Sequence, residues 1–95
     1  MTEARIVAIA AVRQYLEAAF PDGTVETFSA MPERQAQRFL VAFGETTRLA
    51  IVSFEFLDLT SVQDIPKRLD RWRLAEQMAA RGPTGVLVTE GVKPL

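Results

Sequence analysis

Apolar residues recur at helical spacing along the first part of the chain, from Thr2 to Phe20. Glu3, Arg13 and Glu17 fall on the opposite side, so this segment is predicted to be an amphipathic helix. The helix is expected to end before Pro21 and Gly23, because proline cannot continue a helix and glycine permits a turn. The apolar side of this helix consists of Ala8, Ile9, Val12, Leu16, Ala19 and Phe20.

Three strands are predicted next, at Thr24 to Ala30, Arg38 to Phe43 and Arg48 to Phe54, and residues 31–35 interrupt the first two. The polar segment from Gly44 to Thr47 has the length of a hairpin turn. With a turn at Glu45 and Thr46, alternate residues lie on opposite faces. One face carries Phe39, Val41, Phe43, Ala50, Val52 and Phe54, and the other carries Leu40, Ala42, Leu49 and Ile51.

The second half of the chain is predicted to hold one more helix and one more strand. Residues 54–60 follow neither period, which indicates a short turn or helical piece. Thr60 and Asp64 are candidate caps for a helix that ends at Gly82 and Pro83. The apolar run Val86 to Val88, inside Thr84 to Thr89, predicts a covered strand. The apolar side of this second helix consists of Ile65, Leu69, Trp72, Ala75, Met78 and Ala79.

These elements predict one α+β domain (α/β-like) over residues 1–95, in the order α-β-β-β-α-β. We expect a mixed four-stranded sheet, with a β-hairpin, a right-handed β-α-β unit and two helices packed on it. Four strands span nearly 20 Å (about 4.8 Å each) and one helix covers about 10 Å, so one helix cannot cover a whole face. Residues 31–36, the tail 92–95 or a second copy of the chain must cover the remainder. The expected structural core is Ile9, Leu16, Phe20, Phe39, Val41, Ile51, Phe54, Leu69, Trp72, Val86 and Val88.

The order of elements resembles the minimal core of the PD-(D/E)xK nuclease-like fold. That family carries an acid on the second strand and an acid-x-lysine on the third, which hold magnesium and activate water. The strands Arg38 to Phe43 and Arg48 to Ser53 contain no acid and no lysine, and Asp22 lies in a turn before the first strand. The resemblance therefore concerns topology, and no nuclease activity follows from it.

Composition narrows the possible chemistry. The chain contains no cysteine and no histidine, which removes thiolate nucleophiles, disulfides, the commonest general base and the commonest transition-metal ligands. The formal net charge of −1 gives no overall attraction to nucleic acid or to anionic membranes. We therefore expect a non-catalytic protein without a cofactor. With no recognisable leader or membrane anchor, we expect a cytoplasmic location, and the preference for arginine over lysine points to a bacterial source.

Two sets of charged residues suggest alternative functions. Glu55 and Asp58 follow the third strand and Glu90 follows the fourth, where the ends of parallel strands could gather three acids around a cation such as magnesium. The alternative function is a metal-dependent enzyme that processes phosphoesters. If these acids instead lie on solvated loops and near a helix end, they carry no chemistry.

The basic window Lys67 to Arg73 is a candidate nucleic-acid surface, in which Arg68, Arg71 and Arg73 are the candidate binding residues around Trp72. Helical spacing, however, places Trp72 on the apolar side with Leu69, as a core residue. The second alternative is therefore a nucleic-acid-binding accessory protein. The favoured interpretation is a small interaction module that uses an apolar surface to bind a second copy of itself, as a homodimer, or an unidentified protein partner.

Overall fold

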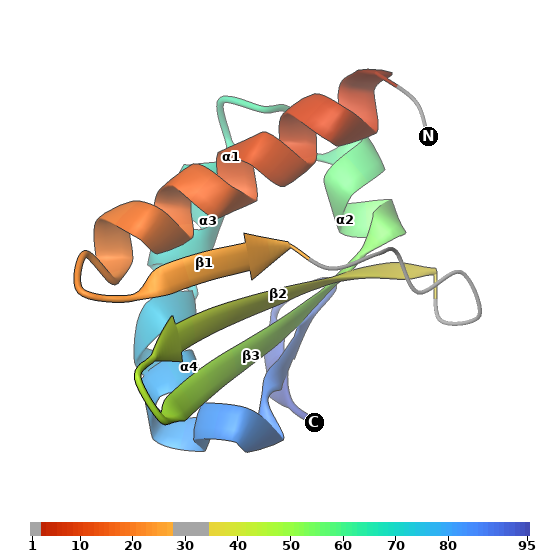
Figure 1. The fold of residues 1–95 in the computed structure, drawn as a ribbon. Helices are drawn as coiled ribbons and strands as arrows, with labels where there is room; N and C mark the ends of the chain where they lie inside the picture. Colours follow the sequence, from red (N-terminus) through yellow and green to blue (C-terminus); the bar gives the residue numbers. More distant parts are fainter. Residues whose placement is uncertain (1–2, 28–34) are drawn as a thin grey trace.

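The chain forms a mixed five-stranded sheet with helices packed against it (Figure 1). A computed structural model describes residues 3–27 and 35–95. The elements in chain order are α1 (Glu3–Ala19), β1 (Thr24–Thr27), β2 (Ala36–Phe43), β3 (Thr46–Ser53), α2 (Phe54–Leu59), α3 (Ile65–Arg71), α4 (Leu74–Arg81), the short 3-10 helix η2 (Gly82–Thr84), β4 (Val86–Val88) and β5 (Val92–Pro94). The predicted α+β class with a mixed sheet is confirmed.

The strands lie side by side in the order β1-β2-β3-β4-β5. All neighbours are antiparallel except β3 and β4, which are parallel, as expected for a strand-helix-strand unit. The hairpin turns at Gly44 and Glu45, because Phe43 pairs with Thr46, one residue earlier than expected. Gly44 has a φ of +58°, which suits a two-residue hairpin turn. The shift moves the pairing by two residues, so each side chain keeps its predicted face.

The prediction of four strands was one strand short. Residues Val92–Pro94 form β5, which pairs antiparallel with β4 at the edge of the sheet. The segment is three residues long, which is too short to show an alternating pattern, and it contains a proline, which argues against a strand. At the other edge, β1 covers Thr24–Thr27 of the predicted strand, and residues 28–30 lie outside the described residues.

The second helix was predicted as one element but is two. α3 ends at Arg71, and α4 begins at Leu74 after Arg73 takes a left-handed conformation, with φ of 56° and ψ of 46°. A continuous α-helix cannot pass through such a residue, so the chain turns at this point. The ambiguous segment after β3 is the helix α2, in which the Ser53 side chain accepts a hydrogen bond from the backbone N–H of Phe56 (3.1 Å).

Tyr15 of α1 lies against this break. Its hydroxyl donates to the carbonyl of Leu69 at 3.5 Å and accepts from the backbone N–H of Ala75 at 3.4 Å. Burial raises the pKa of the Tyr15 hydroxyl, because the ionised form loses solvation. A single side chain therefore contacts both α3 and α4 at the point where they separate.

The helices of the described residues pack on one face of the sheet. One buried cluster contains Phe39, Val41, Ala50 and Val52 of the hairpin together with side chains of α1, α2, α3 and α4. Figure 1 shows these helices above and behind the sheet. The helical contributors to this cluster are Ala8, Val12, Leu16, Phe56, Leu57, Ile65, Leu69, Leu74 and Met78.

Most of the expected core residues are buried in that cluster, but four are placed differently. Ile9, Phe54 and Trp72 are partly buried and pack against the margin of the cluster. Ile51 is buried but lies outside the cluster, because its side chain belongs to the opposite face of β3. The residues inside the cluster are Leu16, Phe20, Phe39, Val41, Leu69, Val86 and Val88.

Candidate functional site

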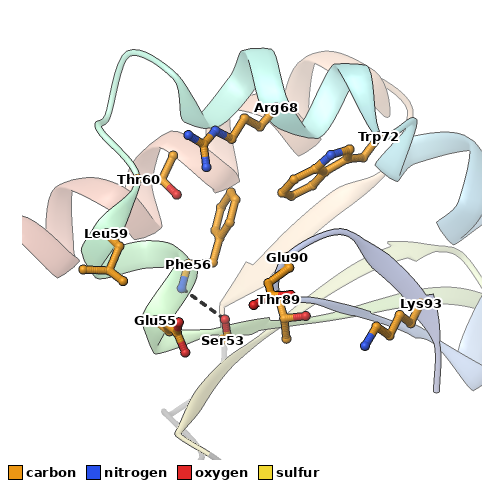
Figure 2. Close-up of a pocket in the computed structure, with 10 residues that line it drawn as sticks. All are labelled: Ser53, Glu55, Phe56, Leu59, Thr60, Arg68, Trp72, Thr89, Glu90 and Lys93. Carbon is orange, nitrogen blue, oxygen red and sulfur yellow. Dashed lines mark hydrogen bonds between the residues drawn. The ribbon is translucent and has the colours of Figure 1, made fainter.

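A pocket of about 520 Å³ opens beyond the carboxyl ends of the parallel strands β3 and β4 (Figure 2). Ser53 ends β3, Thr89 and Glu90 follow β4, and α2 and α3 form the other walls. Open sheets commonly bind ligands at such strand ends, because the connecting segments diverge there and leave a crevice. The complete lining is Ser53, Glu55, Phe56, Leu59, Thr60, Arg68, Trp72, Thr89, Glu90 and Lys93.

Two aromatic rings form the apolar part of this pocket. The ring centroids of Phe56 and Trp72 are 5.6 Å apart, with an angle of 52° between the ring planes. Phe56 is buried, whereas Trp72 is partly exposed because it lies at the end of α3, just before the helix break. Trp72 was predicted as a core residue, and the structure makes it a wall of the pocket that packs against the core.

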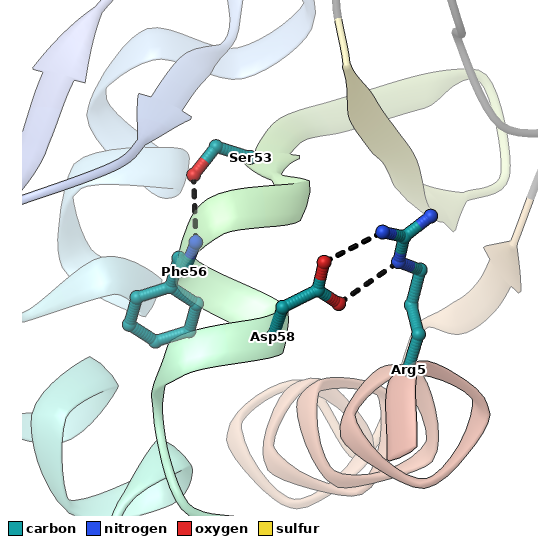
Figure 3. Close-up of polar contacts among 4 residues, drawn as sticks. All are labelled: Arg5, Ser53, Phe56 and Asp58. Atoms are coloured by element: carbon teal, nitrogen blue, oxygen red, sulfur yellow. Dashed lines mark hydrogen bonds and ion pairs between the residues drawn. The ribbon is translucent and has the colours of Figure 1, made fainter. Parts of the chain in front are cut away.

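The three candidate metal ligands do not come together. Glu55 and Glu90 line the pocket, but Asp58 points to the other side of α2, where Arg5 of α1 donates to both of its carboxylate oxygens at 2.9 and 2.6 Å (Figure 3). The hydrogen bonds from Arg5 lower the pKa of the Asp58 carboxyl, and the positive charge of Arg5 acts in the same direction. Within residues 3–27 and 35–95, no group of three or more acids is arranged to hold a metal ion.

Asp58 thus has a structural role that the sequence did not reveal. Its partner Arg5 lies 53 residues earlier in the chain, and the Arg5 guanidinium also lies 4.0 Å from the centroid of the Phe54 ring. The pair and the ring contact attach α1 to the start of α2. No local pattern links residues so far apart in sequence.

Two of the three candidate nucleic-acid residues lie together. Arg68 lines the pocket and also, with Asp64, Lys67 and Arg71, a smaller hollow of about 220 Å³. Arg73, at the helix break, pairs with Glu76 at 3.8 Å. Because Trp72 packs on Phe56, these arginines do not surround an exposed ring, and the combination expected of a stacking surface is not formed.

The second feature is the sheet face that lacks helices, which we call the open face. By register, the open face carries the charged residues Glu26, Arg38 and Lys93. Its apolar residues are Leu40, Ala42, Leu49, Ile51 and Leu87. All of them except Ile51 are partly exposed. Among the described residues, no helix contributes a side chain to the cluster from this side.

The C-terminal residue extends the open face. Leu95 donates its backbone N–H to the carbonyl of Gly85 at 3.2 Å, and its side chain is 44% exposed. A Cβ atom at Gly85 would lie 3.0 Å from side-chain atoms of both Leu49 and Leu95, so these two leucines meet above the glycine. The tail expected to cover part of the sheet therefore contacts its apolar surface. Ile51, in the middle of this face, is 5% exposed, and residues 31–34 of the other predicted cover lie outside the described residues.

Comparison with known proteins gave no match: no family model, curated protein or solved structure is detectably similar to this chain. None of the helices within residues 3–27 and 35–95 combines the length and the apolar character needed to cross a membrane.

Proposed function

We propose that this protein is a small non-catalytic interaction module that pairs with a second copy of itself through the open face. The observation that supports the proposal is that the α-helices of the described residues lie on one face, while the opposite face carries leucines from three neighbouring strands beside Arg38. Apolar side chains gathered on an uncovered surface are typical of a protein contact site. The lack of cysteine and histidine, and the separation of Asp58 from Glu55 and Glu90, support a role without catalysis.

The dimensions of the open face suit a second sheet. Five strands at about 4.8 Å give a width of roughly 24 Å, and the eight-residue strands β2 and β3 are roughly 26 Å long. The face narrows at its edges, because β4 and β5 have three residues each. Two such faces at a separation of about 10 Å would form a sandwich across a two-fold axis. The contact would be near about 600 Å² per partner, which is the lower limit for stable interfaces, so we expect micromolar affinity.

A bacterial cytoplasm is the proposed setting. The support is compositional: arginine is much more frequent than lysine, and alanine is abundant. In that setting the module would act by holding another protein surface, first of all its own.

Sedimentation velocity over about 1 to 500 µM protein tests self-association, since this range brackets a micromolar dissociation constant. We expect a shift from monomer to dimer as concentration rises. Leu87→Lys should weaken the dimer by roughly 100-fold, because the substitution occurs twice in a symmetric interface and each copy removes about 1 to 1.5 kcal/mol. Leu40→Lys, on β2, should have a similar effect.

Ile6→Lys is the matched control. Ile6 is 54% exposed on α1, outside the open face, so the same kind of change there should leave the dimer intact. A protein that stays monomeric at every concentration refutes the proposal. If Ile6→Lys separates the subunits and Leu87→Lys does not, a helical surface forms the dimer instead. Circular dichroism must show that each variant is folded.

A further inference from the structure

The pocket at the ends of β3 and β4 shares only Lys93 with the open face and has the properties of a small-molecule site. Its volume of about 520 Å³ lies in the range of roughly 300 to 1,000 Å³ that is usual for ligand pockets. Its walls come from β3, α2, α3, the turn after β4 and Lys93 of β5, and the first three are held together by the buried cluster beneath them. The pocket is therefore part of the folded structure and does not depend on a partner.

The apolar surface inside the pocket can receive an aromatic or branched group. Phe56 and Trp72 present tilted rings, and Leu59, which is 78% exposed, stands at the rim. Leu59 is the most exposed of the large apolar side chains among the described residues. A ligand that covers Leu59 and the free part of Trp72 would remove apolar surface from water, which favours binding.

The pocket carries two basic side chains, Arg68 and Lys93, and two acidic side chains, Glu55 and Glu90. Figure 2 shows Arg68 reaching from α3 toward the space above Phe56 and beside the Thr60 hydroxyl, with Glu55 and Glu90 on the opposite wall. In the described part of the chain, the Arg68 side chain makes no hydrogen bond or ion pair, and only its backbone is bonded, to Asp64 and Trp72. Its guanidinium is thus available to a carboxylate, which it can bind through two parallel N–H groups.

The acids determine which anions are acceptable. A phosphate or nucleotide would bring two or more negative charges close to Glu55 and Glu90, and like charges at short range repel, which the single charge of Lys93 offsets only in part. A ligand with one carboxylate and one ammonium is complementary in charge to both walls, since the ammonium can lie near the acids while the carboxylate binds Arg68. An ammonium near the Trp72 ring would also gain from the negative face of the indole.

We propose that this pocket binds a small zwitterion with an aromatic or branched apolar body, that is, an aromatic amino acid or a dipeptide that contains one. The carboxylate lies on Arg68 and Thr60, the apolar body lies against Phe56 and Trp72, and the ammonium faces Glu55 and Glu90. The ligand stays chemically unchanged.

Tryptophan fluorescence measures this binding directly, because Trp72 is the sole tryptophan of the chain and lines the pocket. The probes are L-phenylalanine and leucyl-phenylalanine, titrated to about 10 mM at a fixed protein concentration, with calorimetry as a second readout. We expect a saturable change in emission with at least one of them. The N-acetylated and C-amidated forms of that probe should each bind about tenfold more weakly, since each has lost one charged contact.

Arg68→Gln and Arg71→Gln form a matched pair on α3. Arg68→Gln should weaken the probe by about tenfold or more and remove the preference for a free carboxylate, whereas Arg71→Gln should leave both unchanged, because Arg71 lies outside the pocket. Glu90→Gln should reduce the preference for the free ammonium. Because these side chains are exposed, the variants should melt like the parent.

Three results would overturn the proposal: no saturable change with either probe, equal binding by Arg68→Gln and the parent, or tighter binding of ATP than of the zwitterions. Sedimentation on the same samples separates this test from self-association, because the open-face variant Leu87→Lys should still bind the probe. Loss of probe binding in Leu87→Lys, with the fold intact, would place the binding site outside the pocket and would equally overturn the proposal.

Discussion

Replacing Arg73 by glycine should stabilise the protein, although the residue lies between two helical segments. Arg73 has φ of 56° and ψ of 46°, a conformation that places an L-residue under roughly 1 to 2 kcal/mol of strain. Glycine removes this strain, but it increases the conformational entropy of the unfolded chain by an equivalent of about 0.5 to 1 kcal/mol. The ion pair with Glu76 is long, at 3.8 Å, and both side chains are about three-quarters exposed, so its loss costs at most about 0.5 kcal/mol.

The sum is a gain of about 0.5 kcal/mol in the free energy of unfolding, or an increase in Tm of roughly 2 to 4 °C for a domain of this size. Urea unfolding followed by circular dichroism measures it, with an unchanged dependence on denaturant. Ala10→Gly is the control, because Ala10 is exposed in the middle of α1 and glycine there should cost about 1 kcal/mol.

The opposite signs of the two changes make the reasoning refutable. A helix that ran without interruption from residue 65 to residue 81 would lose about 1 kcal/mol on Arg73→Gly, as it would at any other interior position. If Arg73→Gly destabilises the protein as much as Ala10→Gly does, the break between α3 and α4 does not exist in solution.

Two further predictions concern close packing and pH. Gly23→Ala should cost about 1 to 3 kcal/mol in thermal unfolding, because the new Cβ would lie 2.7 Å from Cγ1 of Val41 and 2.9 Å from the Phe43 ring. Gly91→Ala, where nothing lies within 4 Å of the new atom, should be neutral or slightly stabilising, and equal losses at both sites would contradict this argument. The lowered pKa of Asp58 means that its contribution to stability is present above its unfolded-state value of about 3.9 and is lost as pH falls through the folded-state value. Asp58→Asn should therefore be less stable than the parent at pH 7, and the difference should shrink toward pH 2; a constant difference would disprove the linkage.

The periodicities of the sequence determined α1 and the strands β2 and β3. The helical spacing of Ala8, Val12 and Leu16 predicts the buried side of α1, and the alternation along β2 and β3 assigns Phe39 and Leu40 to opposite faces. These assignments survive the one-residue error in the hairpin turn, because an even shift in register does not move a side chain to the other face. The mixed sheet follows from the order of elements, since a strand-helix-strand unit with adjacent strands makes them parallel.

Only the tertiary structure decided which face the helices cover and which residues form the pocket. Both faces of the hairpin are apolar, so the sequence pattern is equally compatible with helices on one side or on both. The break at Arg73 has no local signal, because arginine is a good helix former and the left-handed turn is supported by contacts such as Tyr15 with Leu69 and Ala75. The Asp58 side chain binds Arg5, which is 53 residues away in the sequence, and therefore does not lie with Glu55 and Glu90. Contacts over such separations depend on how the elements pack, and a periodicity read along one segment contains no information about them.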